Sequence, residues 1–66
     1  MADRMDQLIT AAVRQGFAVR QTERGAWVWV KDFQTLITKR TPRTPREWMY
    51  LVNALRGMGL EFPESS

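Results

Sequence analysis

The sequence contains no cysteine and no histidine. Without cysteine, the chain can form no disulfide, no thiolate metal site and no cysteine nucleophile. Without histidine, it lacks the usual zinc ligand and the side chain that most often serves as a general base near neutral pH. These absences exclude many familiar catalytic mechanisms, and we expect the protein to bind no metal and no cofactor.

Long apolar runs and nucleotide-binding glycine motifs are also missing. No apolar stretch approaches the about 18 residues that indicate a membrane span, and the segment MADRMDQ is too acidic and polar for a signal peptide. We therefore expect a cytoplasmic protein with no membrane partner. Because no phosphate-binding or serine-nucleophile motif is present, we expect no enzymatic activity; a divergent nuclease would depend on Tyr50 or a lysine.

The chain is short and its charge is unevenly distributed. Its 66 residues lie near the lower limit for independent folding, so a homodimer is an open alternative. The net charge is +3, but residues 17–46 alone carry seven lysines and arginines against two acidic residues. Such a concentration of positive charge favours an anionic partner such as nucleic acid.

A first helix is predicted from Arg4 to Gln15. Asp3 is suited to cap its first turn, and Gly16 can take the left-handed conformation that ends a helix. Apolar residues recur at the spacing of one helical stripe: Met5, Leu8, Ile9, Ala12 and Val13.

Three short strands are predicted next, over residues 17–22, 26–31 and 35–40, and the short links between them predict antiparallel pairing. Successive side chains of a strand point to opposite faces, so Trp27 and Trp29 share one face while Val28 and Val30 share the other. Both faces are therefore apolar. Three roles stay open for the indoles at this point: the core of the monomer, a protein interface, or contact with nucleic acid.

A second helix is predicted to begin at Pro45. Thr44 and Glu47 have the spacing of a capping box, and proline is favoured at the first helical position. The buried stripe of this helix is predicted to contain four residues: Trp48, Leu51, Val52 and Leu55. Gly57 or Gly59 is expected to end it.

The predicted fold class is α+β, in the order α-β-β-β-α, with two helices packed on one face of a three-stranded antiparallel sheet. We expect one domain over residues 1–62, in which Leu60 and Phe62 fold back onto the core, and a C-terminal tail over residues 63–66.

Several short motifs resemble those of the HicA-type toxins, which are small messenger-RNA interferases with a fold similar to double-stranded-RNA-binding domains. They are the pair Gly16–Phe17, the segment VRQ at Val19 to Gln21, the turn that ends in RGAW, and the close LRGMGL of the second helix. The resemblance spans roughly Met5 to Leu60. It implies an RNA-binding fold and favours RNA over DNA as the partner.

One departure from that family concerns catalysis. HicA-type toxins carry a histidine after a glycine and a small residue at the start of the second strand, and the matching positions here are Gly25, Ala26 and Trp27. Because neither alanine nor tryptophan can shuttle a proton, the resemblance implies a catalytically silent domain.

The candidate nucleic-acid site combines cations with aromatic side chains. Cations would hold phosphates, and aromatic rings would stack on unpaired bases. The predicted residues are Trp27, Trp29, Lys31, Lys39, Arg40, Arg43, Arg46 and Tyr50.

Two functions are consistent with these features. The first is a non-enzymatic nucleic-acid-binding module. The second is a protein-interaction module, of a phage type or associated with a toxin–antitoxin pair, that binds a host factor or itself through the face of Trp27 and Trp29. The concentration of positive charge and the family resemblance favour the first.

Overall fold

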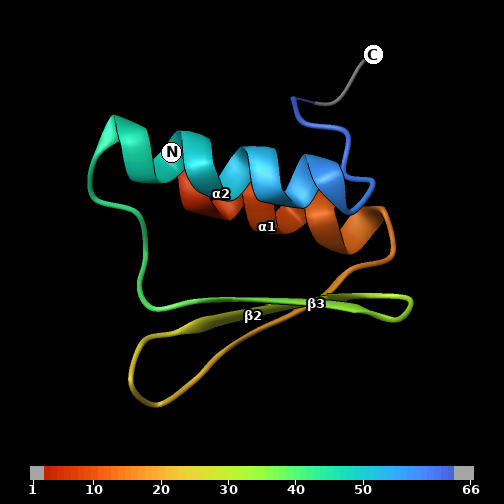
Figure 1. The fold of residues 1–66 in the computed structure, drawn as a ribbon, viewed down its shortest axis with the longest axis horizontal. Coiled ribbons are helices and arrows are strands. Elements are labelled where there is room, and N and C mark those ends of the chain that lie inside the picture. The colour runs from red at the N-terminus through yellow and green to blue at the C-terminus, as the bar shows by residue number, and fades with distance from the viewer. Residues whose placement is uncertain (1–2, 64–66) are drawn as a thin grey trace.

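The computed structural model describes residues 3–63 and shows the predicted α+β fold. Three strands form one layer, and both helices lie on the same side of it (Figure 1). In chain order the elements are α1 (Arg4–Arg14), β1 (Ala18–Gln21), β2 (Trp27–Lys31), β3 (Gln34–Thr38) and α2 (Pro45–Gly57).

Helix α1 begins and ends close to the predicted positions. Asp3 caps it, since its Oδ1 accepts a hydrogen bond of 2.8 Å from the backbone N–H of Asp6. The helix ends at Arg14, one residue before the predicted end. Gly16 follows with a φ of 96°, a conformation that glycine adopts without steric cost.

The sheet is an antiparallel meander in the order β1-β2-β3. A tight turn at Asp32 and Phe33 joins β2 to β3, and Asp32 has a φ of 52°, a left-handed conformation that aspartate tolerates better than most residues. Within residues 3–63, β1 and β3 each pair on one side only, so both are edge strands.

The structure answers the question raised by the alternating residues of β2. Trp29 lies in one row with Val19 and Leu36, has no exposed surface, and belongs to the core beneath the helices. Val28 lies in a row with Arg20 and Ile37 on the face that no helix covers (Figure 1). The role of Trp29 is therefore the core of the monomer.

Apolar area explains why the helices cover this face. An indole buries more apolar surface than a valine, so covering the tryptophan face removes more apolar area from water. Trp29 Nε1 has no hydrogen-bond partner within residues 3–63, which costs about 1–3 kcal/mol for an unsatisfied donor. The large apolar surface of the ring offsets that cost.

The segment after α2 folds back onto the core, as predicted. Leu60 is only 4% exposed, and the ring of Phe62 meets Trp48 edge-on with a centroid distance of 6.3 Å. Arg56 Nε donates a 2.8 Å hydrogen bond to the carbonyl of Phe62. Of the predicted tail over residues 63–66, residues 64–66 lie outside the described part of the chain.

Neither helix that the structure describes is long and apolar enough to cross a membrane.

Candidate functional site

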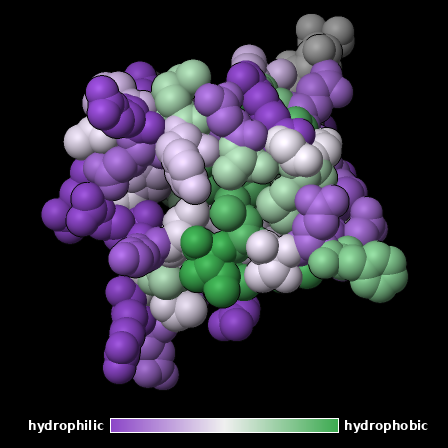
Figure 2. Space-filling model, in the orientation of Figure 1, coloured by the Kyte–Doolittle hydropathy of each residue, from purple (hydrophilic) through white to green (hydrophobic). Residues whose placement is uncertain are grey.

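An open groove of about 540 Å³ lies between β3 and α2. It is lined by three apolar residues, here called its apolar floor: Ile37, Pro42 and Leu51. Figure 2 shows apolar side chains gathered over this region, between α2 and β3, with hydrophilic side chains around them. Four of the predicted site residues line the same groove: Lys39, Arg40, Arg46 and Tyr50.

The local sequence explains why these four side chains meet. Lys39 and Arg40 follow the last residue of β3, where the chain turns up toward α2 (Figure 1). Arg46 lies in the first turn of α2, and Tyr50 follows four residues later on the same helical face. Tyr50 is 71% exposed. The end of β3 and the start of α2 therefore contribute opposite sides of one site.

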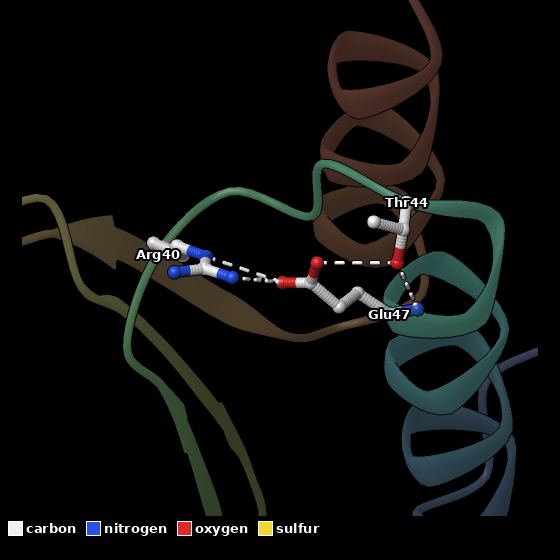
Figure 3. Close-up of polar contacts among 3 residues, drawn as sticks. All are labelled: Arg40, Thr44 and Glu47. Atoms are coloured by element: carbon white, nitrogen blue, oxygen red, sulfur yellow. Dashed lines mark hydrogen bonds and ion pairs between the residues drawn. The ribbon is translucent and has the colours of Figure 1, made fainter.

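A hydrogen-bonded network holds the start of α2 beside the end of β3 (Figure 3). Thr44 Oγ1 accepts a 3.1 Å bond from the backbone N–H of Glu47 and donates a 3.1 Å bond to Glu47 Oε2. Arg40 donates to Glu47 Oε1 from Nε at 3.2 Å and from Nη2 at 3.0 Å. The capping pair is confirmed, and Arg40 extends it.

The same network changes the acidity of Glu47. Desolvation, the largest single influence, raises the pKa of this carboxyl, but the hydrogen bonds from Arg40 and Thr44 lower it. Together with the positive charge of Arg40, these bonds hold the pKa below its ordinary value of 4.5. Glu47 is therefore ionised at neutral pH and neutralises part of the charge of Arg40.

Lys39 and Arg46 differ from Arg40 in this respect. No acidic side chain within residues 3–63 forms an ion pair with either of them. Both residues are exposed. They are therefore the groove cations that an anionic ligand reaches without displacing a partner.

Arg43 lies outside the groove. It lines a second, smaller hollow of about 370 Å³, between the start of α1 and the segment that precedes α2. Arg4 and Trp48 also line that hollow. The structure therefore separates Arg43 from the other cations of the same linker.

Lys31 is not part of the groove either. Trp27 begins β2 and pairs with Thr38, the neighbour of Lys39. Lys31 ends β2, so it lies at the other end of the sheet from Lys39. Its Nζ donates a 2.5 Å hydrogen bond to the carbonyl of Gln15 and lies 5.5 Å from the ring centroid of Phe17. Lys31 therefore ties the end of α1 to the sheet.

The two strand tryptophans are unsuited to the predicted stacking role. Trp29 is fully buried, so the expectation that it contacts a ligand is wrong for this structure. Trp27 is half-buried, and its Nε1 donates a 2.8 Å hydrogen bond to Thr41 Oγ1. The ring of Trp27 thus anchors the linker. The helices cover Trp29, and Trp27 packs beside it against the same core.

Sequence reasoning did not identify the apolar floor of the groove. The sequence predicts only that Ile37 belongs to a strand. Its neighbour Leu36 points to the helix-covered face beside Trp29, so Ile37 is a second apolar residue on the opposite face. An apolar residue on each face of an edge strand was the available signal.

The groove has features that suit a binding site. Exposed cations can hold an anion, and Tyr50 offers a ring face beside an apolar floor. Within residues 3–63 no three acidic side chains come together in a way that could hold a metal ion.

Comparison of the chain with known protein families, with curated proteins and with solved structures gives no significant match. The resemblance to HicA-type toxins therefore stays a prediction based on the short motifs.

Proposed function

We propose that this protein is a small, non-enzymatic nucleic-acid-binding module and that the groove between β3 and α2 is its binding site. One observation carries the proposal: the fold brings Lys39, Arg40 and Arg46 together around an exposed tyrosine and an apolar floor. RNA is the favoured partner because the sequence resembles a catalytically silent HicA-type domain.

The chemistry of the groove suits a nucleotide chain. Lysine and arginine side chains pair with phosphates and release counterions, which makes binding dependent on salt. A base that stacks on an exposed aromatic ring contributes about 1–3 kcal/mol. Lys39 and Arg46 supply the unpaired cations, and Tyr50 supplies the ring.

The proposal of a silent domain is supported at the position where HicA-type toxins carry histidine. Trp27 occupies that position, and its indole N–H, which donates to Thr41 Oγ1, cannot act as a general base. The chain also has no histidine elsewhere. Phosphodiester cleavage by the family mechanism therefore has no proton-transfer group.

The proposal is tested by measuring the affinity for a labelled single-stranded RNA at several salt concentrations, by fluorescence anisotropy. The test variant replaces both Lys39 and Arg46 with alanine. The control replaces Arg20 and Arg24, which lie on the uncovered face and the β1–β2 turn. Both variants lose two positive charges, so they share the same net charge.

We expect the groove variant to bind more weakly and with a shallower salt dependence, by about one unit of slope for each lost phosphate contact. The control should keep the wild-type slope. Equal weakening of the two variants would show attraction by net charge without a site. Affinity that does not change with salt would contradict the proposal.

A further inference from the structure

The groove between β3 and α2 adjoins the second hollow, the one that Arg43 lines. Pro42 belongs to the lining of both. The linker, residues 39–44, therefore carries cations on both sides: Lys39 and Arg40 at the groove, and Arg43 at the hollow. A ligand held in the groove needs only to pass Pro42 to reach the hollow.

The second hollow offers positive charge of its own. Arg4 and Arg43 line it, both are exposed, and neither forms an ion pair within residues 3–63. A guanidinium group can pair with a phosphate through two parallel hydrogen bonds, so each arginine offers a place for one phosphate. Of the described residues that line the hollow, only Asp3 is acidic, and its Oδ1 already accepts from the backbone N–H of Asp6.

Positive charge continues from the groove toward the second hollow and not toward the far ends of the two elements. Along β3, residues 34–38 are uncharged, and the turn before them carries Asp32. Along α2, the next cation after Arg46 is Arg56, whose Nε donates a 2.8 Å hydrogen bond to the carbonyl of Phe62. A polyanion that follows the positive charge out of the groove therefore passes over the linker.

The linker is fixed at both ends, so the groove and the hollow keep a constant spacing. Trp27 Nε1 donates a 2.8 Å hydrogen bond to Thr41 Oγ1, and Thr44 caps α2. Lys39 and Arg43 are four residues apart, which limits their Cα separation to at most about 14 Å. A ligand that spans the two sites does not have to order this segment first.

We propose that a single strand of RNA crosses the linker at Pro42 and places further phosphates against Arg43 and Arg4 in the second hollow. This extension rests on the proposed function, because the groove holds the first part of the strand. It also defines the ligand: a single strand long enough to reach both sites.

The chemistry and shape of the two sites favour a single strand over a duplex. The ring of Tyr50 and the apolar floor suit the faces of unpaired bases, which a duplex hides in its stack. A double helix is also stiff, over about 150 base pairs in the case of DNA. A single strand can bend around Pro42 and enter both sites.

The test compares affinities for two single-stranded RNAs. One is a trinucleotide, and the other has about ten nucleotides, within the range of about 4–16 that single-strand binding sites occupy. Three double variants each lose two positive charges: Arg4→Ala with Arg43→Ala (the hollow variant), Lys39→Ala with Arg46→Ala (the groove variant), and Arg20→Ala with Arg24→Ala (the control). Circular dichroism checks that each variant folds.

We expect the hollow variant to bind the longer RNA about tenfold more weakly than the control does, through the loss of two charge-assisted phosphate contacts. Its salt dependence should be shallower by about one unit of slope for each lost contact. Its affinity for the trinucleotide should equal that of the control. The groove variant should bind both RNAs more weakly.

The possible failures are distinguishable. A hollow variant that binds both RNAs as the control does would show a ligand confined to the groove, which overturns the extension and leaves the proposed function intact. Equal weakening for both RNAs would overturn the extension too, because it would show an effect that does not depend on reaching the hollow. If the natural chain binds neither RNA, the proposed function fails and the extension fails with it.

A duplex RNA of the same length tests the choice of a single strand. The hollow variant and the control should bind it equally, because a stiff helix cannot follow the linker into the second hollow. A loss of duplex affinity in the hollow variant as large as the loss for the single strand would contradict the proposed ligand.

NMR titration of the natural chain gives an independent measurement. The longer RNA should shift the backbone amides of Met5, Arg43 and Trp48, which line the second hollow, and the trinucleotide should leave them nearly unchanged. If both RNAs shift only the amides of the groove, the strand does not cross Pro42 and the proposal is wrong.

Discussion

Lys31 and Lys39 lie in the same cation-rich middle of the sequence, but the fold uses them differently. Lys31 donates to the carbonyl of Gln15 and lies over the ring of Phe17, so it joins α1 to the sheet. Lys39 lies at the rim of the groove between β3 and α2 and has no acidic partner within residues 3–63. A cation in a charge cluster is available to a ligand only where the fold has not already given it a partner.

The same contrast separates the aromatic residues. Trp29 is fully buried beneath the helices, whereas Tyr50 is 71% exposed beside the groove. On one side of the molecule, around α1, β1 and Glu61, side chains form contacts that hold the fold together. The other side, around β3 and the first half of α2, presents cations and apolar side chains to solvent.

The largest expected effect is on the buried member of the aromatic pair. Trp29→Ala should lower the free energy of unfolding by about 3–5 kcal/mol, because it removes a large core side chain and leaves a cavity. In a domain of this size that loss amounts to unfolding. Tyr50→Ala should change stability by less than about 0.5 kcal/mol. Chemical denaturation followed by circular dichroism measures both, and equal losses would contradict the contrast.

The cap of α2 should give the next largest effect. Thr44→Ala should lower the free energy of unfolding by about 1 kcal/mol, because it removes the oxygen that accepts from the N–H of Glu47. Thr44→Ser keeps that oxygen and serves as the control in the same denaturation experiment. A loss from the serine variant as large as from the alanine variant would show that the methyl group, rather than the cap, matters.

The two lysines should separate stability from binding. Lys31→Ala should lower the free energy of unfolding by about 1 kcal/mol through the lost hydrogen bond to Gln15, and it should leave RNA affinity little changed. Lys39→Ala should weaken RNA binding and leave stability unchanged. Denaturation and anisotropy measured on both variants test this. The contrast fails if both lysines affect the same property.

Removing the charge of Glu47 should sharpen the contrast between Arg40 and its neighbours. Glu47→Gln removes a negative charge from the groove and releases Arg40 from its ion pair. We therefore expect tighter RNA binding, together with a small loss of stability at neutral pH. Asp6→Asn, in the first turn of α1, removes a negative charge away from the groove and is the matched control. Equal gains in affinity would indicate net charge alone.

The pH dependence of stability should show the smallest effect. The folded pKa of Glu47 lies below its ordinary value of 4.5, so its ionised form stabilises the folded state at pH values above that value. This contribution is lost as the pH falls through the lowered folded pKa, where the carboxyl takes up a proton. Glu47→Gln should therefore lose less stability on acidification than the natural chain. Denaturation curves from neutral to acidic pH measure this difference.

Local rules were sufficient to predict most of the fold. The Asp3 cap, the Thr44–Glu47 capping pair and the spacing of the apolar residues correctly predicted both helices. The short links correctly predicted an antiparallel meander. These features depend on residues close together in the sequence, which is why the sequence alone determined them.

The candidate site was harder to predict because it depends on which side chains the fold has already used. The pattern of β2 left both faces apolar, and only packing decided that Trp29 belongs to the core. The sequence groups Lys31 and Arg43 with the other cations. In the structure, Lys31 donates to the carbonyl of Gln15 and Arg43 lines the second hollow, so neither lines the groove. Tertiary contacts of this kind have no signal in local spacing.

The most direct test of the central claim is an NMR titration with a single-stranded RNA that follows the backbone amide shifts. The shifts should concentrate in residues 37–50, at the end of β3, the linker and the first half of α2. Lys31 and the β1–β2 turn should show little change. Shifts centred on that turn or on the uncovered face of the sheet, or no shifts even at low salt, would contradict the claim that this groove binds nucleic acid.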